Sequence, residues 1–503
     1  MLFVFRQIYQ TGMGKREKSP KKVKLFSGLM AIPIAIAVIG AVGWLASQSF
    51  FPGNAEKYST VLVTEDADFA TDIPEVNYSE IPFIDKDSAI LLGNRTMGTM
   101  ADYVSQFEIS DLYSQINYKG QPVRVSPLNY ADFFKWWANK DGGIPAYVIV
   151  NMSTQDTEIV RLENPIRYSD SDPFFYNVDR HVQLSYPFYM FDEKSFEIND
   201  DGEPFWIYPV QKRTIGLFGG TTIQRVVLCN ASTGECQDFA IEDVPQWVDR
   251  AYPAELLIEQ YNWSGALSGG WINSWLGQNG VKQTTPSTDG KSGFNYIAQD
   301  DDVWVYSGVT SATADNSIIG CVMINQRTAE SKFYSVAGAT EESAMRSAEG
   351  QVQHLQYDAT FPLLINVDGQ PTYFMALKDA AGLVKMYAMV DIQRYQNVAV
   401  GDTLAATEKS YKQLLVSQGV NVGGSDASAH PSAGSTSGTI ASISPVVLDG
   451  NSHYYLILDG QQAIFDCPVA SVVDVVRYKV GDVIVLNHGS SEGNVVLVDS
   501  IGE

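Results

Sequence analysis

Hydrophobic residues follow three patterns along this chain, and each pattern predicts a different kind of element. One unbroken apolar run, FSGLMAIPIAIAVIGAVGWLAS at 26–47, contains no charged side chain and predicts a helix that spans a bilayer. Apolar residues with helical spacing predict shorter helices at 96–107, 131–139, 245–250, 341–350 and 403–415. Alternating apolar residues predict strands, among them a hairpin over 113–125 with its turn at Lys119-Gly120. The chain is therefore predicted to be an α+β protein with an N-terminal transmembrane helix.

Three hairpins share one turn sequence, in which an apolar strand is followed by Asn-x-x-Thr-x-acidic and a second strand. The segments are AYVIVNMSTQDTEIV at 146–160, RVVLCNASTGECQDF at 225–239 and GCVMINQRTAESKFY at 320–334. Asn and Thr side chains bond to their own backbone in such turns, and Asn tolerates left-handed dihedral angles. The matched positions are Asn151, Thr154, Asp156, Asn230, Thr233, Glu235, Asn325, Thr328 and Glu330. The alternative to a repeat is that hairpins look alike because turns use few residue types.

A Gly-x-Pro strand precedes two of these hairpins, as GIPAYV at 143–148 and GEPFWI at 202–207, and helical segments follow. This order resembles the PepSY-type repeat of exported bacterial proteins, which packs a helix on a small antiparallel sheet. The resemblance covers roughly residues 140–415. The whole chain also resembles a family of single-pass envelope proteins of Gram-positive bacteria. These resemblances imply an exported body built from antiparallel sheet and helix repeats, and they carry over no catalytic residue.

The C-terminal part is set apart by its composition. Residues 418–438 are rich in Gly, Ser and Ala and predict a flexible linker before a last domain at 439–503. That domain shows about five strands separated by Asp-Gly turns, and its Lys-x-Gly-Asp turn at 479–482 resembles that of a small OB-fold β-barrel. Such barrels bind nucleic acids or sugars on one face. Arg477 and Lys479 are the only basic residues after Gly438, which argues against a nucleic acid.

A basic stretch directly before the apolar run predicts its orientation, because basic flanks stay on the cytoplasmic side. The basic residues nearest to the run are Lys15, Arg16, Lys18, Lys21, Lys22 and Lys24. We therefore predict a cytoplasmic tail at 1–25, a transmembrane helix at 26–47, a tether at 48–79 and an extracytoplasmic body at 80–417. A cleaved signal peptide is the alternative, although the run is longer than a typical signal core. The chain would be a single-pass protein of the cell membrane, with its bulk outside the cytoplasm.

The net charge of the chain narrows the range of partners. The whole chain carries −24 and residues 1–24 carry +6, so the remaining residues carry about −30. An acidic surface of this size repels phosphate backbones, and we therefore expect no nucleic-acid partner. The sequence does not indicate an oligomeric state.

The sequence lacks the metal-binding and cofactor-binding signatures HExxH, the Walker pattern and GxGxxG. We expect no cofactor and no metal ion, and we expect His181 and His354 to be structural. The acidic run Asp300-Asp301-Asp302 is expected to be a solvated turn rather than a Ca²⁺ site, because neighbours on a strand point to opposite faces.

Two groups of residues remain as candidates for a site. Cys229 and Cys236 flank the turn NASTGE and would face each other across a hairpin, either as a disulfide or as two free thiols. Trp263, Trp271 and Trp275 lie in YNWSGALSGGWINSWL at 261–276. Their rings would stack on a sugar, dock a partner or enter the membrane interface, or they would simply close the core beneath the loop.

Together these patterns predict a membrane-anchored extracytoplasmic scaffold or regulatory binding protein of the bacterial cell envelope that is not an enzyme. Its partners would be the membrane, envelope proteins or wall glycan. The alternative is a hydrolase that acts on wall glycan or peptide, with an active site assembled only by folding.

Overall fold

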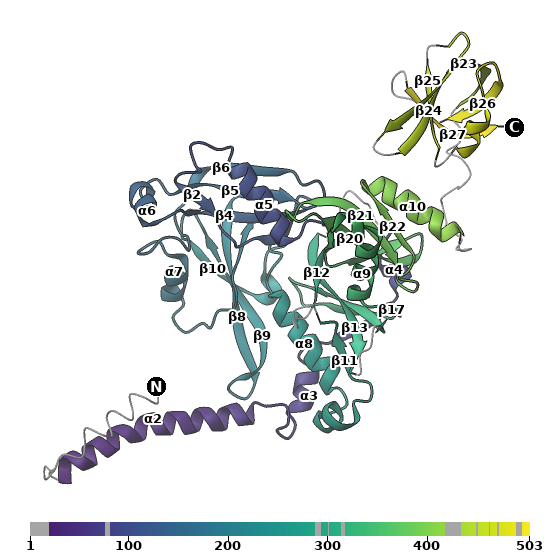
Figure 1. Cartoon of the computed structure of the whole chain (residues 1–503). Helices are drawn as coiled ribbons and strands as arrows, with labels where there is room; N and C mark the ends of the chain where they lie inside the picture. The colour runs from purple at the N-terminus through teal and green to yellow at the C-terminus, as the bar shows by residue number, and fades with distance from the viewer. Residues whose placement is uncertain are drawn as a thin grey trace. The chain divides into compact units, whose positions relative to one another are not determined.

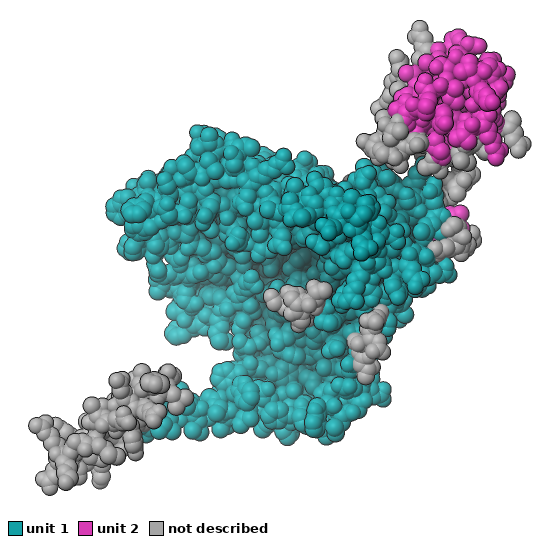
Figure 2. All heavy atoms as spheres, viewed as in Figure 1, with its two compact units in different colours: residues 1–414 teal, residues 415–503 magenta. Residues whose placement is uncertain are grey.

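The computed structural model describes residues 20–75, 81–286, 293–299, 301–312, 317–417, 434–448, 451–461, 463–469, 472–488 and 495–502. The chain divides into two compact units, residues 1–414 and residues 415–503, which are coloured separately in Figure 2. Within the described residues, the first unit is a mixed α+β fold with four larger sheets and one two-stranded sheet (Figure 1). The predicted α+β class is therefore confirmed.

The first sheet has the order β2-β4-β5-β6, and β3 also pairs with β4. Lys119 and Gly120 join β3 to β4 with φ angles of 53° and 75°, the left-handed pair that a two-residue hairpin favours. The predicted hairpin over 113–125 is therefore confirmed. Helices α5 and α6 contact the strands of this sheet. The elements are α5 (Lys86–Met97), β2 (Phe107–Ile109), β3 (Ser114–Tyr118), β4 (Gln121–Tyr130), α6 (Phe133–Asn139), β5 (Ile144–Asn151) and β6 (Thr157–Ile166).

The second sheet is dominated by a long hairpin, β8–β9, in the order β10-β9-β8-β7. Helix α8 follows it in the chain and buries Leu257 and Tyr261 against Val226 of β9 and Ile324 of the third sheet. The elements are α7 (Val178–Ser185), β7 (Ser195–Ile198), β8 (Pro204–Ile215), β9 (Gly219–Asn230), β10 (Cys236–Ala240), the 3₁₀ turn η2 (Ile241–Asp243), α8 (Ala254–Leu267) and the π-helical turn η3 (Asn273–Gly277).

The third sheet has the order β1-β16-β15-β13-β11, with β12 on β13. Its elements are β1 (Thr64–Ala67), β11 (Lys282–Thr284), β12 (Asn295–Gln299), β13 (Asp302–Ser311), β15 (Gly320–Asn325) and β16 (Ser331–Tyr334). Strands β14 (Ser317–Ile318) and β17 (Gly338–Ala339) form the two-stranded sheet.

The fourth sheet has the order β18-β20-β21-β22, with β19 on β20. Its core is shared with the third sheet, because Tyr306 of β13 and Tyr373 of β20 are buried in one cluster with Ala344 of α9. The elements are α9 (Glu341–Gln351), the 3₁₀ turn η4 (Gln353–Leu355), β18 (Asp358–Ala359), β19 (Leu363–Val367), β20 (Gln370–Lys378), β21 (Val384–Asp391), β22 (Val398–Gly401) and α10 (Leu404–Ser417). The helices predicted at 341–350 and 403–415 are therefore confirmed.

The three predicted Asn turns adopt one structure. In the first, Asn151 Oδ1 accepts from the backbone amides of Ser153 at 2.8 Å and Thr154 at 3.0 Å. Asn230 and Asn325 accept from the equivalent amides at 2.8–3.0 Å. The fifth residue of each turn has a positive φ: 68° at Gln155, 76° at Gly234 and 60° at Ala329. The same local chemistry therefore builds a hairpin turn in three different sheets.

The predicted tether at 48–79 is wrong for much of its length. Helix α3 (Asn54–Ser59), strand β1 and the short helix α4 (Phe69–Asp72) belong to the first unit. Strand β1 pairs in parallel with β16, and Leu62 and Phe69 are 3% and 8% exposed. A few widely spaced apolar anchors are enough to fix this segment, although its overall composition is polar.

Two predicted helices are also wrong. The helix predicted at 96–107 does not form. Helix α5 begins after Asp85, whose carboxylate accepts from the amide of Ser88 at 2.9 Å, and it ends at Met97. Phe107 begins strand β2. Residues 245–250 form no helix, because the amides of Asp249 and Arg250 donate to the buried Glu197 carboxylate.

Helix α2 (Pro20–Ala46) precedes the body. Among the residues that the structure describes, no helix reaches the length and apolar character that crossing a membrane requires. The side chains of residues 20–30 lie outside that description, and they include the first part of the membrane segment predicted at 26–47.

The second unit closes five strands into a small barrel in the order β23-β24-β25-β27-β26. Its core contains Leu456, Phe465, Cys467 and Leu486. The elements are β23 (Gly434–Leu448), β24 (Asn451–Leu458), β25 (Ile464–Pro468), the 3₁₀ turn η5 (Val473–Arg477), β26 (Val483–His488) and β27 (Val495–Gly502). Most of the linker predicted at 418–438 lies outside the described residues, and β23 already begins at Gly434.

Candidate functional site

The end of helix α2 is fastened to the body by a buried set of hydrogen bonds around Ser47. The Ser47 hydroxyl donates to the carbonyl of Gly43 at 2.7 Å and accepts from the amide of Phe218 at 3.1 Å. The Ser47 carbonyl accepts from the Tyr58 hydroxyl at 2.8 Å. Asn54 Nδ2 donates to the carbonyl of Ala46 at 2.8 Å, which satisfies one of the carbonyls that a helix end leaves unpaired. The helix therefore meets the body at a fixed joint.

Exposed apolar side chains surround this joint, and we call them the apolar collar. They come from the end of α2 and the turn after it, from the tip of the β8–β9 hairpin, and from the turn after α8, which lie at the same end of the body in Figure 1. Each is between 38% and 69% exposed. The collar consists of Trp44, Leu45, Phe50, Phe51, Leu217, Phe218, Trp271, Ile272, Trp275 and Leu276.

Direct contacts join the three segments of the collar. The rings of Phe50 and Trp271 lie edge to face with centroids 6.0 Å apart, and Trp271 stacks on Trp275 at 6.1 Å. At the hairpin tip, a Cβ on Gly43 would lie 2.7 Å from Leu217 Cδ1. The collar is therefore one connected apolar surface rather than a set of isolated exposed side chains. A contiguous apolar surface of this kind marks an interaction site.

The structure separates the three tryptophans that the sequence singled out. Trp271 and Trp275 belong to the collar and are 38% and 68% exposed. Trp263 lies on α8, where its half-buried ring packs edge to face on Tyr58 with centroids 5.0 Å apart. Trp263 therefore supports the joint from inside, whereas the other two face outward. Leu217 and Phe218 lie in another apolar, glycine-rich segment, TIGLFGGTTI at 214–223, and this composition is the feature of the sequence that indicates their place beside the tryptophan loop.

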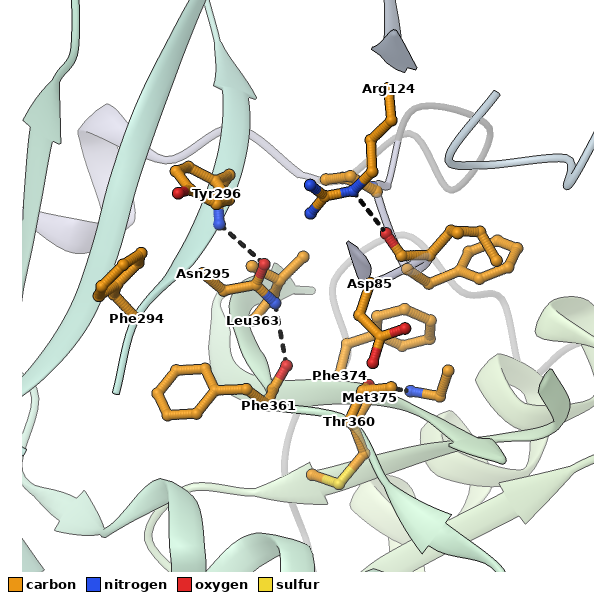
Figure 3. A pocket seen from close by; sticks show the side chains of 14 residues that line it. Asp85, Arg124, Phe294, Asn295, Tyr296, Thr360, Phe361, Leu363, Phe374 and Met375 are labelled. Atoms are coloured by element: carbon orange, nitrogen blue, oxygen red, sulfur yellow. Dashed lines mark hydrogen bonds between the residues drawn. The ribbon is translucent and has the colours of Figure 1, made fainter. Parts of the chain in front are cut away.

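A second candidate is a partly open cavity of about 160 Å³ where the first, third and fourth sheets meet. Figure 3 shows Arg124 of β4, Tyr296 of β12 and Met375 of β20 on its walls. The Arg124 side chain donates to the carbonyl of Ile84 at 3.3 Å and to Gln115 Oε1 at 3.2 Å. Both acceptors are neutral, and burial lowers the pKa of this guanidinium. Its charge therefore makes the cavity suitable for a small anionic group.

Asp85 lines the same cavity, but its carboxylate is paired with a lysine rather than with Arg124. It forms an ion pair with Lys378 and accepts from the amide of Ser88. Burial raises the pKa of Asp85, but the hydrogen bonds from Lys378 and Ser88 outweigh burial and lower it overall. The carboxylate stays ionised and paired, so it does not neutralise Arg124 by direct contact.

Two carboxylates do come together inside the body, at Glu197 and Asp249. Glu197 accepts from the Ser195 hydroxyl at 2.8 Å and from the amide of Asp249 at 2.9 Å, and burial raises the pKa of both carboxyl groups. Neither residue lines the Arg124 cavity or the apolar cavity of about 330 Å³ beside it. Their geometry is that of a structural brace, because an acid pair for glycan cleavage must face its substrate.

Cys229 and Cys236, the other predicted site residues, lie at directly paired positions of β9 and β10. Both are free thiols, so the predicted disulfide stays a prediction.

Comparisons with known proteins give little for either site. No family model and no curated protein matches the chain. A cobalt-substituted ACO from Synechocystis matches at 8% identity and a TM-score of 0.13, over 57% of this chain and 47% of that one. The GH32 β-fructofuranosidase BmSUC1 of Bombyx mori matches at 10% identity and a TM-score of 0.18, over 81% and 69%. A protein of unknown function from Dyadobacter fermentans matches at 11% and 0.18, over 71% and 92%. TM-scores this low carry no argument about fold or function.

Proposed function

We propose that this protein is a membrane-anchored extracytoplasmic binding protein of the bacterial envelope, whose body rests on the outer surface of the bilayer through the apolar collar. The observation that carries this proposal is the position of the collar, which surrounds the end of the apolar helix α2. A collar at that place would lie at the level of the lipid headgroups if α2 enters the membrane. Trp and other amphipathic rings are favoured at that level.

The charge of the body supports contact by apolar side chains rather than by electrostatic attraction. Residues 25–503 carry about −30, and an anionic lipid surface repels such a body. Each fully buried aromatic or large aliphatic side chain contributes about 1.5–3 kcal/mol, so a few collar residues can hold the body at the surface. The contact should therefore be insensitive to salt.

Quenching of tryptophan fluorescence by brominated lipids tests the proposal on the full chain in vesicles. Trp275, which is 68% exposed in the collar, should be quenched, whereas Trp137 on α6, which is 63% exposed, should not. Replacing Trp275 by Tyr should remove part of the quenchable emission, and replacing Trp137 by Tyr should remove none. If the two substitutions behave alike, the collar does not touch lipid.

The binding role would belong to the body and to the second unit, which we propose to be an OB-like module. The parallel pairing of β25 with β27, the short helix η5 before β26 and the strand order support an OB-like arrangement. In OB folds the face of the second and third strands carries the ligand, and here His453 and Asp466 form a pair at 2.7 Å on those strands. With few basic residues in this unit, a saccharide or a protein is the expected ligand class.

Affinity capture with the full chain, from detergent-solubilised membranes and on isolated wall glycan, tests this role. Enrichment of one envelope protein would support a scaffold, and retention on glycan would support a wall-binding module. Recovery of neither would contradict the binding role but not the position of the collar. The two described cavities do not support the hydrolase alternative, because neither is lined by two carboxylates.

A further inference from the structure

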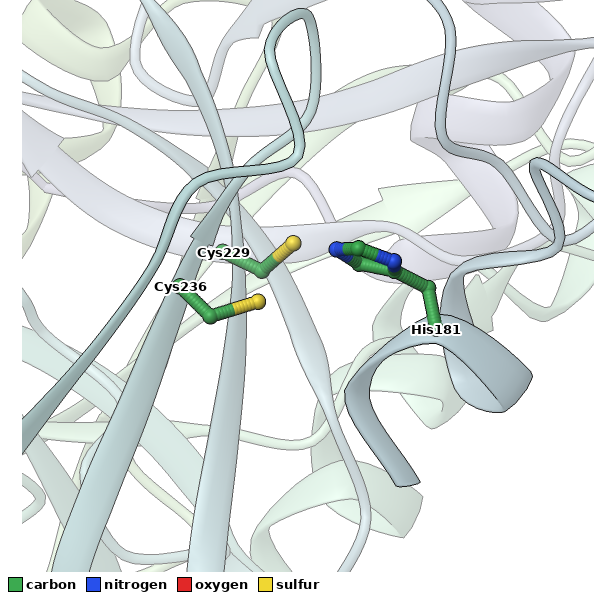
Figure 4. Close-up of side chains that lie close together, drawn as sticks. All are labelled: His181, Cys229 and Cys236. Atoms are coloured by element: carbon green, nitrogen blue, oxygen red, sulfur yellow. The ribbon is translucent and has the colours of Figure 1, made fainter. Parts of the chain in front are cut away.

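Three potential metal ligands from two separate segments of the chain come together beside strands β9 and β10 of the second sheet. Cys229 of β9 and Cys236 of β10 are directly paired across the hairpin, and His181 is brought to them by helix α7. The two sulfur atoms and a ring nitrogen of His181 all lie within 4.8 Å of one another. In Figure 4 the three side chains point toward one another, and one ring nitrogen faces the sulfur atoms. Within the described part of the chain, this is the group of ligand residues that comes together in this way.

The surroundings hold His181 in place. Its Nε2 donates to the carbonyl of Gly234 at 2.7 Å, in the turn between the two cysteines. In this tautomer Nδ1 carries the free lone pair, and a metal ion bound at Nε2 would have to displace the proton and this hydrogen bond. The imidazole packs on the ring of Tyr168, with centroids 4.3 Å apart. Gly234 has a φ of 76°, and a Cβ there would lie 2.2 Å from Tyr168 Cε2. The second Asn turn therefore positions the histidine as well as the cysteines, which gives the ligands a rigid frame.

The electrostatics favour a thiolate at this place. The pKa of Cys236 is lowered to about 7, chiefly by its hydrogen bond with Cys229 and also by the neighbouring His181. The pKa of Cys229 is raised, because it shares a hydrogen bond with Cys236 and is buried. The pair therefore loses its first proton more readily than an isolated thiol does. Thiolate is the form that binds metals, and a divalent ion with two thiolates and a neutral imidazole has no net charge, which suits a buried site.

We propose that His181, Cys229 and Cys236 bind a zinc ion, with the fourth position of the tetrahedron left for water or another small ligand. Zn²⁺ takes sulfur ligands at about 2.3 Å and nitrogen at about 2.0–2.1 Å. Tetrahedral ligands at those distances lie roughly 3.4–3.8 Å apart. The ligand atoms already lie within 4.8 Å of one another, so they need to approach by at most about 1.0–1.4 Å to reach those separations. The proposal does not depend on the proposed membrane contact.

The sequence hides this site because the ligands do not follow a zinc spacing. The two cysteines flank a six-residue turn sequence, NASTGE, rather than forming CxxC, and the histidine lies on a separate helix. Zinc binding and a Cys229–Cys236 disulfide exclude each other, because the disulfide would consume two of the three ligands. The reduced chain should therefore bind the metal ion, and the chain with the disulfide should not.

The experiment uses the full chain, purified in detergent with a reductant and titrated with Co²⁺ as a spectroscopic substitute for Zn²⁺. We expect one metal ion per chain, the charge-transfer band of a thiolate–cobalt bond and the visible bands of tetrahedral cobalt. Competing Zn²⁺ should remove both. Binding should release protons and weaken as the pH falls, because the thiols must ionise.

Matched variants separate ligand loss from misfolding. Cys229→Ser and Cys236→Ser should abolish the charge-transfer band, whereas Cys321→Ser and Cys467→Ser, at buried thiols elsewhere, should leave it unchanged. His181→Ala should lower the affinity at least tenfold, and His181→Cys should restore it. Zn²⁺ should raise the melting temperature of the parent chain but not of Cys236→Ser.

The proposal is overturned if the reduced chain shows no thiolate–cobalt band, or if His181→Ala binds as tightly as the parent chain. A Cys229–Cys236 disulfide found by mass spectrometry in protein isolated from cells without added reductant would also overturn it, when reduction of that protein does not restore metal binding.

Discussion

Arg327 holds Asp302 in a two-point ion pair, with Nε 2.7 Å from Oδ1 and Nη2 2.7 Å from Oδ2. Asn325 Nδ2 donates to the same carboxylate at 2.7 Å. Arg327 and Asn325 belong to the third Asn turn, whereas Asp302 begins the neighbouring strand β13. The pair therefore fastens the turn of one hairpin to the strand beside it. Asp302 is 5% exposed, so the expectation of a solvated acidic turn is wrong at this residue.

Removal of Arg327 should destabilise the body strongly. Arg327→Ala leaves a buried carboxylate without its cation, and breaking such a pair costs about 3 kcal/mol or more. The matched control is Arg346→Ala, which removes an ion pair with Glu342 between side chains that are 71% and 45% exposed and should cost less than about 0.5 kcal/mol. Urea denaturation followed by tryptophan fluorescence measures both. Equal losses in the two variants would show that the Asp302 pair is no stronger than a surface pair.

The Asn turns predict a substitution that is tolerated and one that is not. Asn151→Ala removes the acceptor of two backbone amides and should cost about 1–2 kcal/mol. Asn151→Asp keeps the acceptor and should cost much less. The structure supports this, because Asp391 makes the corresponding bonds in the turn after β21, to the amides of Gln393 and Arg394 at 2.8 and 3.0 Å. Thermal unfolding of the two variants measures the difference in stability. If Asn151→Asp is as unstable as Asn151→Ala, the side-chain acceptor does not stabilise the turn.

These turns also show which parts of the fold are predictable from the sequence. An Asn side chain bonds to amides two and three residues further on, so the turn is encoded within one short segment. Helices α9 and α10 are likewise predicted correctly from apolar spacing. Strand β1 was missed because its partner is distant: the hydroxyls of Thr64 and Ser331 are 2.9 Å apart across 267 residues of sequence. No local pattern records such a pairing.

The candidate sites show the same difference between local features, which the sequence predicts, and contacts between distant segments, which it does not. Trp271 and Trp275 are visible in the sequence as aromatic residues in a glycine-rich loop, but only the fold places them beside Phe50 and the end of α2. The facing of Cys229 and Cys236 follows from the hairpin, whereas the approach of His181 depends on how α7 packs. Sequence reasoning therefore finds site residues that share a segment and misses those that tertiary packing brings together.

The Arg124 cavity should respond to small anions. If the buried guanidinium lacks a neutralising contact, acetate or sulfate that reaches the cavity will stabilise the folded chain by binding only to it. We expect the melting temperature to rise with acetate concentration in the parent chain, at constant ionic strength, and to rise less in Arg124→Gln. Arg346→Ala is the control for general salt effects. The same response in the parent chain and in Arg124→Gln would remove the cavity as the binding place.

Glu341 should make stability depend on pH. Its side chain is 2% exposed and accepts from the amide of Gly308 at 2.7 Å, and burial raises its pKa above the ordinary value of 4.5. The folded chain thus keeps a proton that the unfolded chain loses. The stabilisation is fully present below about pH 4.5 and is lost as the pH rises through the folded-state pKa.

Glu341→Gln carries an amide in place of the protonated acid and does not titrate. Its stability relative to the parent chain should therefore increase from pH 4.5 upward, by roughly 1.4 kcal/mol for each unit by which the pKa is raised. Glu197 and Asp249 also have raised pKa values, but they are present in both chains and cancel in the comparison. Urea denaturation at several pH values measures the difference. A difference that does not change with pH would mean that Glu341 titrates alike in both states.

Gly219 should be essential to the joint between α2 and the body. A Cβ at this position would lie 2.3 Å from Tyr58 Oη and 2.6 Å from the carbonyl oxygen of Ser47, two atoms that are hydrogen-bonded to each other at 2.8 Å. Gly219→Ala should therefore separate this bond and weaken the joint by about 1–3 kcal/mol. Limited proteolysis of the full chain in detergent measures the effect as faster cleavage between residues 48 and 60. Gly40→Ala is the control, because no atom lies within 4 Å of a Cβ there. Cleavage of Gly219→Ala at the parent rate would show that this contact does not hold the helix, and the collar would then need another means of staying beside α2.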